Sequence, residues 1–188
     1  MQKAHTPEFR VSFPSVFKAR SFNNGDPKFS ITMLFKKGTD LTELKKLAAA
    51  AAKEKWPTPE SRPKKLRNPF RDGDTEKADM DGYAGHIFVS ASSKMAPGVV
   101  DRNRNPIDTD TEFYAGCYAH ATVTAYAYNQ KGNAGVAFGL QNVQKLRDGE
   151  PFSGRSKAED DFEDLGGSID SLEGASLADS PATDDIDF

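Results

Sequence analysis

One stretch of the sequence decides the fold: Tyr118-Ala119-His120-Ala121-Thr122-Val123-Thr124-Ala125-Tyr126-Ala127-Tyr128-Asn129. Small apolar residues alternate in it with polar and aromatic residues, and a period of two is typical of a β-strand with two different faces. The turn sequence Gln130-Lys131-Gly132-Asn133 comes next, followed by a second strand-like run over residues 134–147. The pattern therefore predicts a long β-hairpin whose first strand begins near Phe113.

The two faces of the long strand predict different roles. One face carries small side chains that suit the interior of a narrow barrel: Ala119, Ala121, Val123, Ala125 and Ala127. The other face carries a histidine and three tyrosines among threonines: His120, Tyr118, Tyr126 and Tyr128. Flat rings on a solvated sheet face can stack on unpaired bases, and each stack contributes about 1–3 kcal/mol. The alternative is that these tyrosines are ordinary strand formers at the rim of the core.

Three further strands are predicted upstream of the hairpin. The first two alternate with polar residues on either side of a turn at residues 23–27, and their apolar positions are Phe9, Val11 and Phe13, then Phe29, Ile31, Met33 and Phe35. The third has one face made of Ile87, Val89 and Ala91, which places Phe88 on the polar face with His86 and Ser90. Phe88 is there either a fourth stacking platform or a residue covered by the helix.

One helix is predicted between Asp40 and Pro57. Asp40 suits the N-cap position, and Glu43 three residues later completes a capping box. Leucines and alanines recur at helical spacing as far as Trp56, after which Pro57 ends the helix. Five hydrophobic strands and one helix, with long loops between them, indicate a mainly β protein that forms a small antiparallel barrel or a sandwich.

Two long loops carry candidate phosphate-binding residues. The loop over residues 57–85 contains Lys64, Lys65, Arg67 and Arg71, and the loop over residues 94–112 contains Lys94, Arg102 and Arg104. Loops this long inside a domain are usually functional or partly disordered. Cations of this kind hold backbone phosphates with an affinity that falls steeply with salt, although any single one could simply be solvated surface.

The charge is divided unevenly along the chain. Residues 158–188 contain eleven acidic residues and no basic one, while residues 1–157 contain all 25 Lys and Arg and 17 acidic residues. The first part therefore carries +8 and the second −11. We expect residues 1–157 to form one domain and residues 158–188 to form a disordered acidic tail. The basic domain favours nucleic acid as its ligand.

The acidic tail has a candidate partner-binding tip: Asp184, Asp185, Ile186, Asp187 and Phe188. Ile186 and Phe188 could fill a small pocket on a partner while the carboxylates meet its Lys and Arg. The tail could also occupy the basic groove of its own domain and compete with DNA. The alternative is a tail that only increases solubility.

We expect neither a metal nor a cofactor. No Cys/His cluster has zinc spacing, the single cysteine, Cys117, allows no intramolecular disulfide, and there is no glycine-rich phosphate loop. The sequence has no signal-peptide core and no apolar run of membrane length, so we expect a cytoplasmic protein and no membrane contact. An acidic cluster keeps a metal-dependent nucleic-acid enzyme open as an alternative, and its members are Asp72, Asp74, Asp79 and Asp81. A DNA-mimic interaction protein is a second alternative.

Over nearly its whole length the chain resembles the phage-type single-stranded-DNA-binding proteins with an OB-fold. The segments that carry the resemblance are residues 10–17 (RVSFPSVF), 53–56 (KEKW), 69–74 (PFRDGD), 98–101 (GVVD), 113–118 (FYAGCY) and 135–145 (GVAFGLQNVQK). The acidic tip is similar to that of bacterial single-stranded-DNA-binding proteins.

The resemblance implies a five-stranded OB-like barrel and a non-enzymatic protein that binds single-stranded DNA during phage replication or recombination. Replication or recombination proteins would be its tail partners, and the oligomeric state stays open. In the usual OB-fold the helix follows the third strand, whereas here it follows the second predicted one. Either a strand near the N-terminus is missing from the prediction or the topology is modified.

Overall fold

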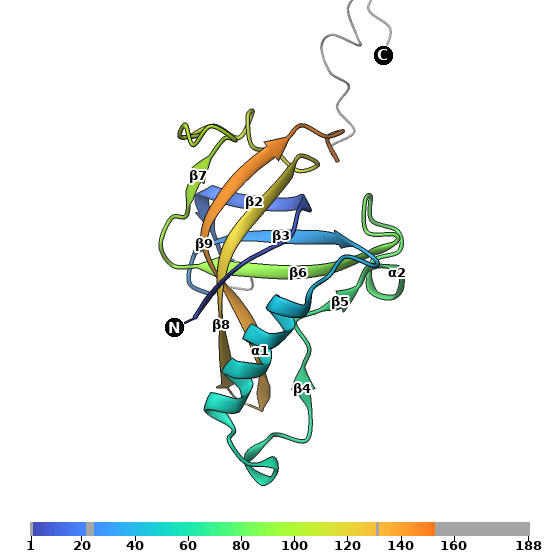
Figure 1. Ribbon diagram of the computed structural model, residues 1–188, viewed down its shortest axis with the longest axis vertical. Helices are drawn as coiled ribbons and strands as arrows, with labels where there is room; N and C mark the ends of the chain where they lie inside the picture. The colour runs from blue at the N-terminus through green and yellow to red at the C-terminus, as the bar shows by residue number, and fades with distance from the viewer. Residues whose placement is uncertain (1, 22–24, 131, 153–188) are drawn as a thin grey trace, which may run out of the picture. The chain divides into compact units, whose positions relative to one another are not determined.

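The computed structural model describes residues 2–21, 25–130 and 132–152. The predicted tail over residues 158–188, with its tip at residues 184–188, lies outside the described residues. The elements shown in Figure 1 are β1 (Lys3–His5), β2 (Phe9–Arg20), β3 (Lys28–Lys36), α1 (Thr42–Lys55), the 3-10 turn η1 (Pro59–Ser61), β4 (Leu66–Arg67), β5 (Arg71–Asp72), α2 (Gly73–Glu76), β6 (His86–Ser93), β7 (Gly98–Val100), β8 (Tyr118–Gln130) and β9 (Asn133–Arg147).

Five long strands close into a barrel. Hydrogen bonds join β8 to β2, β2 to β3, β3 to β6, β6 to β9, and β9 back to β8. This closed ring confirms the OB-like five-stranded barrel. The ring is antiparallel except between β6 and β9, which pair in parallel at Ala91 with Phe138 and at Ser92 with Gly139. In Figure 1, β8 and β9 run together as one long hairpin, and α1 lies against its lower half.

The barrel interior is built from the small face of β8, as predicted. Ala119 and Val123 are fully buried, and Ala125 is 8% exposed. Larger side chains from β2, β3 and β6 fill the space that these small residues leave, including Val11, Met33 and Val89. The helix α1 closes one end, because its buried residues belong to the same core: Leu44, Leu47 and Ala48.

Strand β2 departs from the expected alternation at Phe13. Its backbone has a φ of +44°, and the pairing register of β2 with β3 shifts between Ser12 and Ser15. Pro14 follows directly and has no N–H to donate to the ladder, which favours an irregularity at this point. The shift turns the Phe13 ring outward, so that it is 53% exposed. The expectation that Phe13 continues the inward face of Phe9 and Val11 was wrong.

The helix begins one residue later than predicted, because its N-cap residue is Leu41 and not Asp40. Asp40 accepts a hydrogen bond from the Thr42 N–H at 2.9 Å, but Glu43 pairs with Lys46 at 3.0 Å instead of returning to the N-cap. The helix ends at Lys55, before Pro57, as predicted.

A short strand, β1, was missed near the N-terminus. It pairs with β8 and makes α1 follow the third strand of the chain. Three residues are too short to show a period, which is why no alternation marked this strand.

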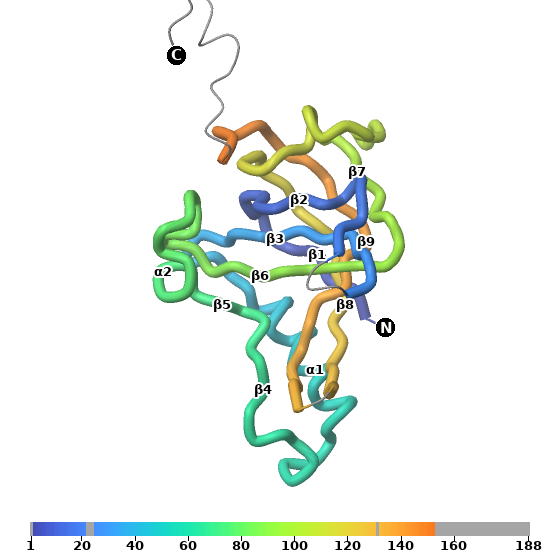
Figure 2. Tube along the Cα trace, turned by 180° about the vertical axis from the view of Figure 1, so that it is seen from behind, coloured from blue at the N-terminus to red at the C-terminus, as the bar shows by residue number. Residues whose placement is uncertain are grey.

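The long loop over residues 57–85 runs along the barrel and adds two short strands to it. Strand β4 pairs in parallel with the start of β9, and β5 pairs with β6. Figure 2 shows this loop from behind, where β4 passes beside β9 on its way to α2. The second loop contributes β7, which pairs with the other half of β9. Among the described residues, no helix is both long and apolar enough to cross a bilayer.

Candidate nucleic-acid interface

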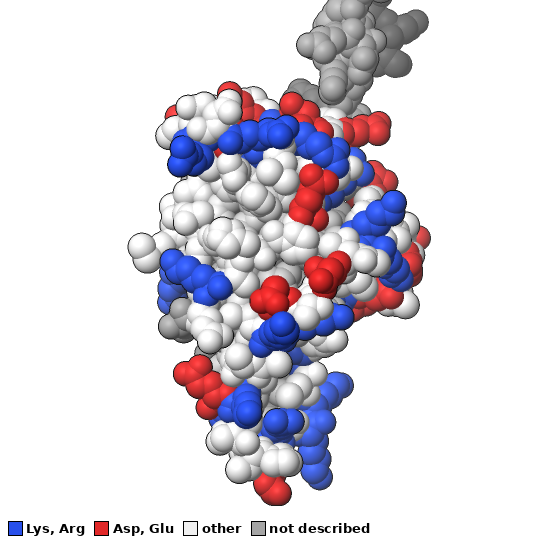
Figure 3. All heavy atoms as spheres, viewed as in Figure 1, with Lys and Arg blue, Asp and Glu red and all other residues white. Residues whose placement is uncertain are grey.

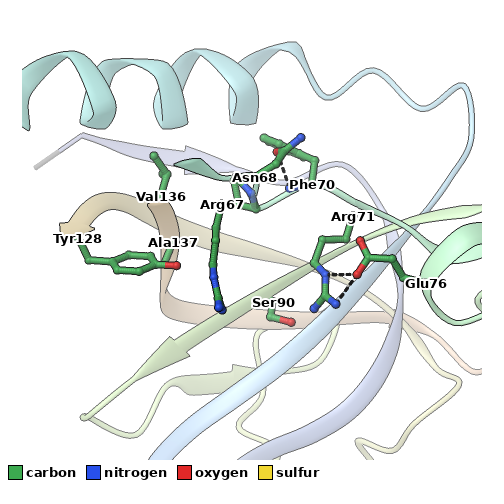
Figure 4. Close-up of a pocket in the computed structure, with 10 residues that line it drawn as sticks. Arg67, Asn68, Phe70, Arg71, Glu76, Ser90, Tyr128, Val136 and Ala137 are labelled. Atoms are coloured by element: carbon green, nitrogen blue, oxygen red, sulfur yellow. Dashed lines mark hydrogen bonds and ion pairs between the residues drawn. The ribbon is translucent and has the colours of Figure 1, made fainter. Parts of the chain in front are cut away.

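A groove of about 620 Å³ lies on the outside of the barrel where β4, β5, β6, β8 and β9 come together. Figure 4 shows the side chains around it. Those that bear on ligand binding are two arginines, two aromatic residues and two small residues: Arg67, Arg71, Phe70, Tyr128, Ser90 and Ala137. The groove therefore combines flat rings and cations on a floor of short side chains, which is the combination that single-stranded nucleic acids require.

Arg67 and Tyr128 meet in this groove because of a glycine on the strand between them. Gly135 pairs with Arg67 of β4 on one side and with Tyr128 of β8 on the other. A Cβ at residue 135 would lie 2.9 Å from the Arg67 Cβ and 2.9 Å from the Tyr128 hydroxyl oxygen. Arg67 also donates a hydrogen bond to Asn133 Oδ1 at 3.1 Å, and its guanidinium extends into the groove beside the Tyr128 ring (Figure 4).

Arg71 is held more firmly than Arg67. Its Nε donates to Glu76 Oε2 at 2.8 Å, and its guanidinium carbon lies 4.7 Å from the centre of the Phe88 ring. Because Glu76 offsets its charge locally, Arg71 attracts a phosphate less strongly than an unpaired arginine would. Arg71 therefore contributes to the shape of the groove as well as to its positive charge.

Phe88 is not available as a stacking platform. It is 1% exposed and packs edge-on against Tyr83, with ring centres 5.2 Å apart, and against Leu34. The predicted DNA contact at Phe88 is therefore corrected. The prediction of a covered residue holds, but the cover is Tyr83 and the Arg71 guanidinium rather than the helix α1.

Tyr126 and Tyr128 lie near the end of β8, on its outer face. Tyr126 is 36% exposed and pairs across the sheet with Ala137, while Tyr128 lines the groove and pairs with Gly135. Directly opposite neighbours are the side chains that normally cover a ring on a sheet face. Alanine and glycine offer a methyl group at most, so neither of these directly opposite residues covers its ring.

Tyr118 and His120 lie on the same face but are engaged by the protein itself. The Arg147 guanidinium carbon lies 3.5 Å from the centre of the Tyr118 ring, and Glu8 holds that arginine by an ion pair of 2.7 Å. His120 Nε2 shares a hydrogen bond of 2.7 Å with Gln144 Oε1. The structure therefore separates the four predicted rings into an engaged pair and an open pair.

The cations of the two long loops also differ in their surroundings: some are exposed beside the groove, one is paired with an acid, and others lie away from the groove. Lys64 and Lys65 are exposed and directly precede β4, so they lie along the chain beside Arg67. Lys94 is paired with Asp26 at 3.2 Å. Arg102 and Arg104 are exposed on the turn after β7, which pairs with the other half of β9. Figure 3 shows Lys and Arg gathered over α1 and the loop below it, and again in a band at the opposite end.

The acidic cluster of the first loop has structural partners. Lys37 Nζ lies 2.9 Å from the Asp72 carboxylate and 2.6 Å from that of Asp74. These hydrogen bonds hold the pKa of both carboxyls below the ordinary value of 3.8 and raise the pKa of Lys37 above 10.5. Asp79 and Asp81 are exposed. Among the residues that the structure describes, no three His, Cys, Asp or Glu are grouped so that they could hold a metal.

Phe70 is a groove residue that the sequence reasoning missed. Its ring packs edge-on against Phe138 of the barrel at 5.7 Å between centres, which fixes it between Arg67 and Arg71. The available signal was an aromatic residue interleaved with cations at Arg67-Asn68-Pro69-Phe70-Arg71. Ser90 and Ala137 carried no such signal, because short side chains become a groove floor only through the sheet pairing.

Three solved structures are similar to this chain. The single-stranded-DNA-binding protein from bacteriophage Enc34, in complex with ssDNA, matches with a TM-score of 0.67 and 24% identity over 80% of this chain and 89% of that one. The same phage protein in another structure matches with a TM-score of 0.65 over 86% and 90% of the two chains, again at 24% identity. The single-stranded DNA-binding protein gp2.5 of bacteriophage T7 matches with a TM-score of 0.55 and 13% identity over 84% and 98%. These likenesses support the fold.

Sequence comparison shows the family. A curated relative, "Putative protein p50" of Acyrthosiphon pisum secondary endosymbiont phage 1, is 37% identical over 170 aligned residues, in an alignment that covers 83% of this chain and 90% of that protein. The family model described as "Enterobacter phage Enc34, ssDNA-binding protein" matches residues 2–172. The chain therefore belongs to the family of the Enc34 phage single-stranded-DNA-binding protein.

Proposed function

We propose that this protein binds single-stranded DNA with little sequence preference and protects it during phage DNA replication or recombination in the infected cell. The observation that carries the proposal is the meeting of the Arg67 guanidinium and the Tyr128 ring in one groove, in a chain of this family. The protein acts by binding, and no catalytic step is assigned to it.

Bases stack on the open rings of Tyr126 and Tyr128. Each ring offers a face that no large side chain of β9 covers. Stacking on a tyrosine accepts any base, because every base has a π-face, so the expected sequence preference is weak. Bases inside a duplex are already stacked on their neighbours, which favours single strands at this site.

Phosphates are held by the cations at the groove and beside it. Arg67 extends into the groove, and Lys64 and Lys65 precede it on the exposed loop. Each neutralised phosphate releases condensed counterions, so the affinity falls as salt rises. Arg102 and Arg104 lie near the other half of β9, so they contact only a DNA strand long enough to extend beyond the groove.

A titration of a labelled dT oligonucleotide by fluorescence anisotropy, at several salt concentrations, tests this assignment. Arg67→Ala is expected to weaken binding and to reduce the slope of log affinity against log salt by about 1. Lys94→Ala is the matched control, since Lys94 is an exposed cation paired with Asp26 and does not line the groove. Equal affinities and slopes for wild type and Arg67→Ala would contradict the groove assignment.

We also propose that residues 158–188 recruit replication or recombination proteins and compete with DNA for the basic domain. The support is sequence alone: eleven acidic residues, with Ile186 and Phe188 set among the last three acids. A chain ending at Lys157 is expected to bind dT oligonucleotide more tightly than the full chain, most clearly at low salt. Weaker binding by the shortened chain would contradict the competition.

A further inference from the structure

Phe13 is an exposed aromatic residue that the groove does not use. Its ring is 53% exposed, although it belongs to a strand of the barrel. Its backbone φ of +44° is costly for a residue with a large side chain, so the surroundings must hold it there. Strain of this kind gathers at binding sites, which makes Phe13 a candidate ligand contact.

A hollow of about 410 Å³ opens beside Phe13. Its walls include Phe13, Pro14, Met80, Tyr83 and Phe152, so it is mainly apolar, and Ser12 also lines it. Ser12 Oγ and the Tyr83 hydroxyl are 3.1 Å apart, so both have a hydrogen-bond partner. A volume of this size lies within the range of roughly 300–1,000 Å³ typical of small-ligand pockets.

One rung of the sheet connects this hollow to the groove. Ser12 of β2 pairs with Thr32 of β3, and Thr32 pairs with Ser90 of β6. Ser12 lines the hollow, Ser90 lines the groove, and the Thr32 and Ser90 hydroxyls are 3.3 Å apart. Two strand spacings amount to roughly 10 Å. A single DNA strand can therefore reach both places, since one OB-fold commonly binds about 4–16 nucleotides.

The charges around the hollow suit a nucleotide. Lys77 Nζ lies 5.4 Å from the centre of the Phe13 ring and 5.1 Å from that of Tyr83. None of the ion pairs found among the described residues includes Lys77. Arg20 adds a second cation at the rim and Asp81 an acid, so the rim carries two cations to one carboxylate.

We infer that Phe13 and this hollow form a second base-binding subsite, which takes an unpaired base of the same DNA strand that occupies the Tyr128 groove. The Phe13 ring stacks on the base, and Lys77 attracts the neighbouring phosphate. This inference rests on the proposed function and adds the path of the DNA over the protein surface. The DNA runs from β8 across β9, β6 and β3 to β2.

The test uses the full chain, a labelled dT oligonucleotide of about 16 nucleotides, the upper limit for one OB-fold, and a labelled thymidine dinucleotide, which is too short to occupy both places at once. Phe13→Leu keeps an apolar side chain but removes the ring. Its affinity for the long oligonucleotide is expected to fall about 5- to 140-fold, the equivalent of one lost stack. Its affinity for the dinucleotide, which cannot reach Phe13 from the groove, is expected to stay unchanged, and Phe13→Trp is expected to bind the long oligonucleotide like wild type.

Met95→Leu is the matched control, because Met95 is 79% exposed and lines neither hollow. Equal affinity of wild type and Phe13→Leu for the long oligonucleotide would overturn the subsite and leave the groove intact. A loss that is the same at both lengths and comes with a lower melting temperature would also overturn it, as a structural effect. Failure of the wild-type protein to bind either oligonucleotide would instead reject the proposed function.

Discussion

The two halves of the outer face of β8 carry the same kinds of side chain and use them differently. Near its start, the Tyr118 ring is covered by the Arg147 guanidinium at 3.5 Å, and His120 is bonded to Gln144. Near its end, Tyr126 and Tyr128 face Ala137 and Gly135, which cover nothing. We call these the engaged half and the open half.

We infer from this difference that the role of a tyrosine on this strand depends on its neighbour on β9. A cation across the sheet supplies the ring with a partner inside the protein and stabilises the fold. A glycine or alanine leaves the ring face for an external partner. We therefore propose that the same residue type supports stability at one end of the strand and DNA binding at the other.

The largest expected effect is a loss of DNA affinity when an aromatic ring is removed from the open half. Tyr128→Ala is expected to weaken binding of a dT oligonucleotide by about 1–3 kcal/mol, because a stacked base loses its platform. Fluorescence anisotropy measures the change. Tyr128→Phe, which keeps the ring, is the control and is expected to retain most of the affinity. An unchanged affinity for the alanine variants of both Tyr126 and Tyr128 would reject the open half as the base site.

A second substitution is expected to damage the engaged half alone. A Cβ at Gly149 would overlap the Gly116 carbonyl oxygen and lie 2.8 Å from Tyr118 Cε2. Gly149→Ala is therefore expected to lower the free energy of unfolding by about 1–3 kcal/mol, as overpacking usually does. Chemical denaturation measures this loss. DNA affinity of the folded variant is expected to match wild type, and a selective loss of DNA binding would contradict the division.

A milder change in the engaged half is Tyr118→Leu. It removes the ring from the Arg147 guanidinium but leaves the Glu8 ion pair and the barrel interior in place. The melting temperature is expected to fall by less than in Gly149→Ala, and affinity for dT oligonucleotide is expected to stay within about twofold. If Tyr118→Leu weakened DNA binding as strongly as Tyr128→Ala, the two halves would share one role.

The smallest expected effect is a change of stability at low pH, and it comes from the loop that borders the open half. Lys37 lowers the pKa of Asp72 and Asp74, so the pair contributes stability above their ordinary value of 3.8. That contribution is lost as the pH falls through the lowered values. The difference in unfolding free energy between wild type and Lys37→Met is therefore expected to be constant between about pH 5 and about pH 9 and to shrink below about pH 5. A difference that did not change between pH 2 and pH 5 would contradict this assignment.

The sequence predicted the features that depend on local pattern. The small inward face of β8, the hairpin, the extent of α1 to Lys55 and the barrel class follow from period, turn residues and proline. Phe13 was misplaced because a shift of register changes which face a residue occupies, and nothing in the alternation marks it. Phe88 was offered as a platform because its cover comes from Tyr83, on a loop without a period.

The site was harder to predict, because the sheet pairing assembles it. Arg67 reaches Tyr128 only through the parallel pairing of β4 with β9, between residues more than sixty positions apart in the chain. The sequence named both residues as candidates but could not separate them from Tyr118, Arg102 or Arg104. The engaged and open halves differ in their cross-strand partners, which composition and period do not contain.

Photocrosslinking of the full-length protein tests the division of β8 most directly. A dT oligonucleotide that carries 5-iododeoxyuridine would be crosslinked to the unmodified chain, and tandem mass spectrometry would locate the attached residues. We predict crosslinks at Tyr126 and Tyr128 and none at Tyr118. Crosslinks concentrated at Tyr118, with Tyr126 and Tyr128 unmodified, would contradict the account.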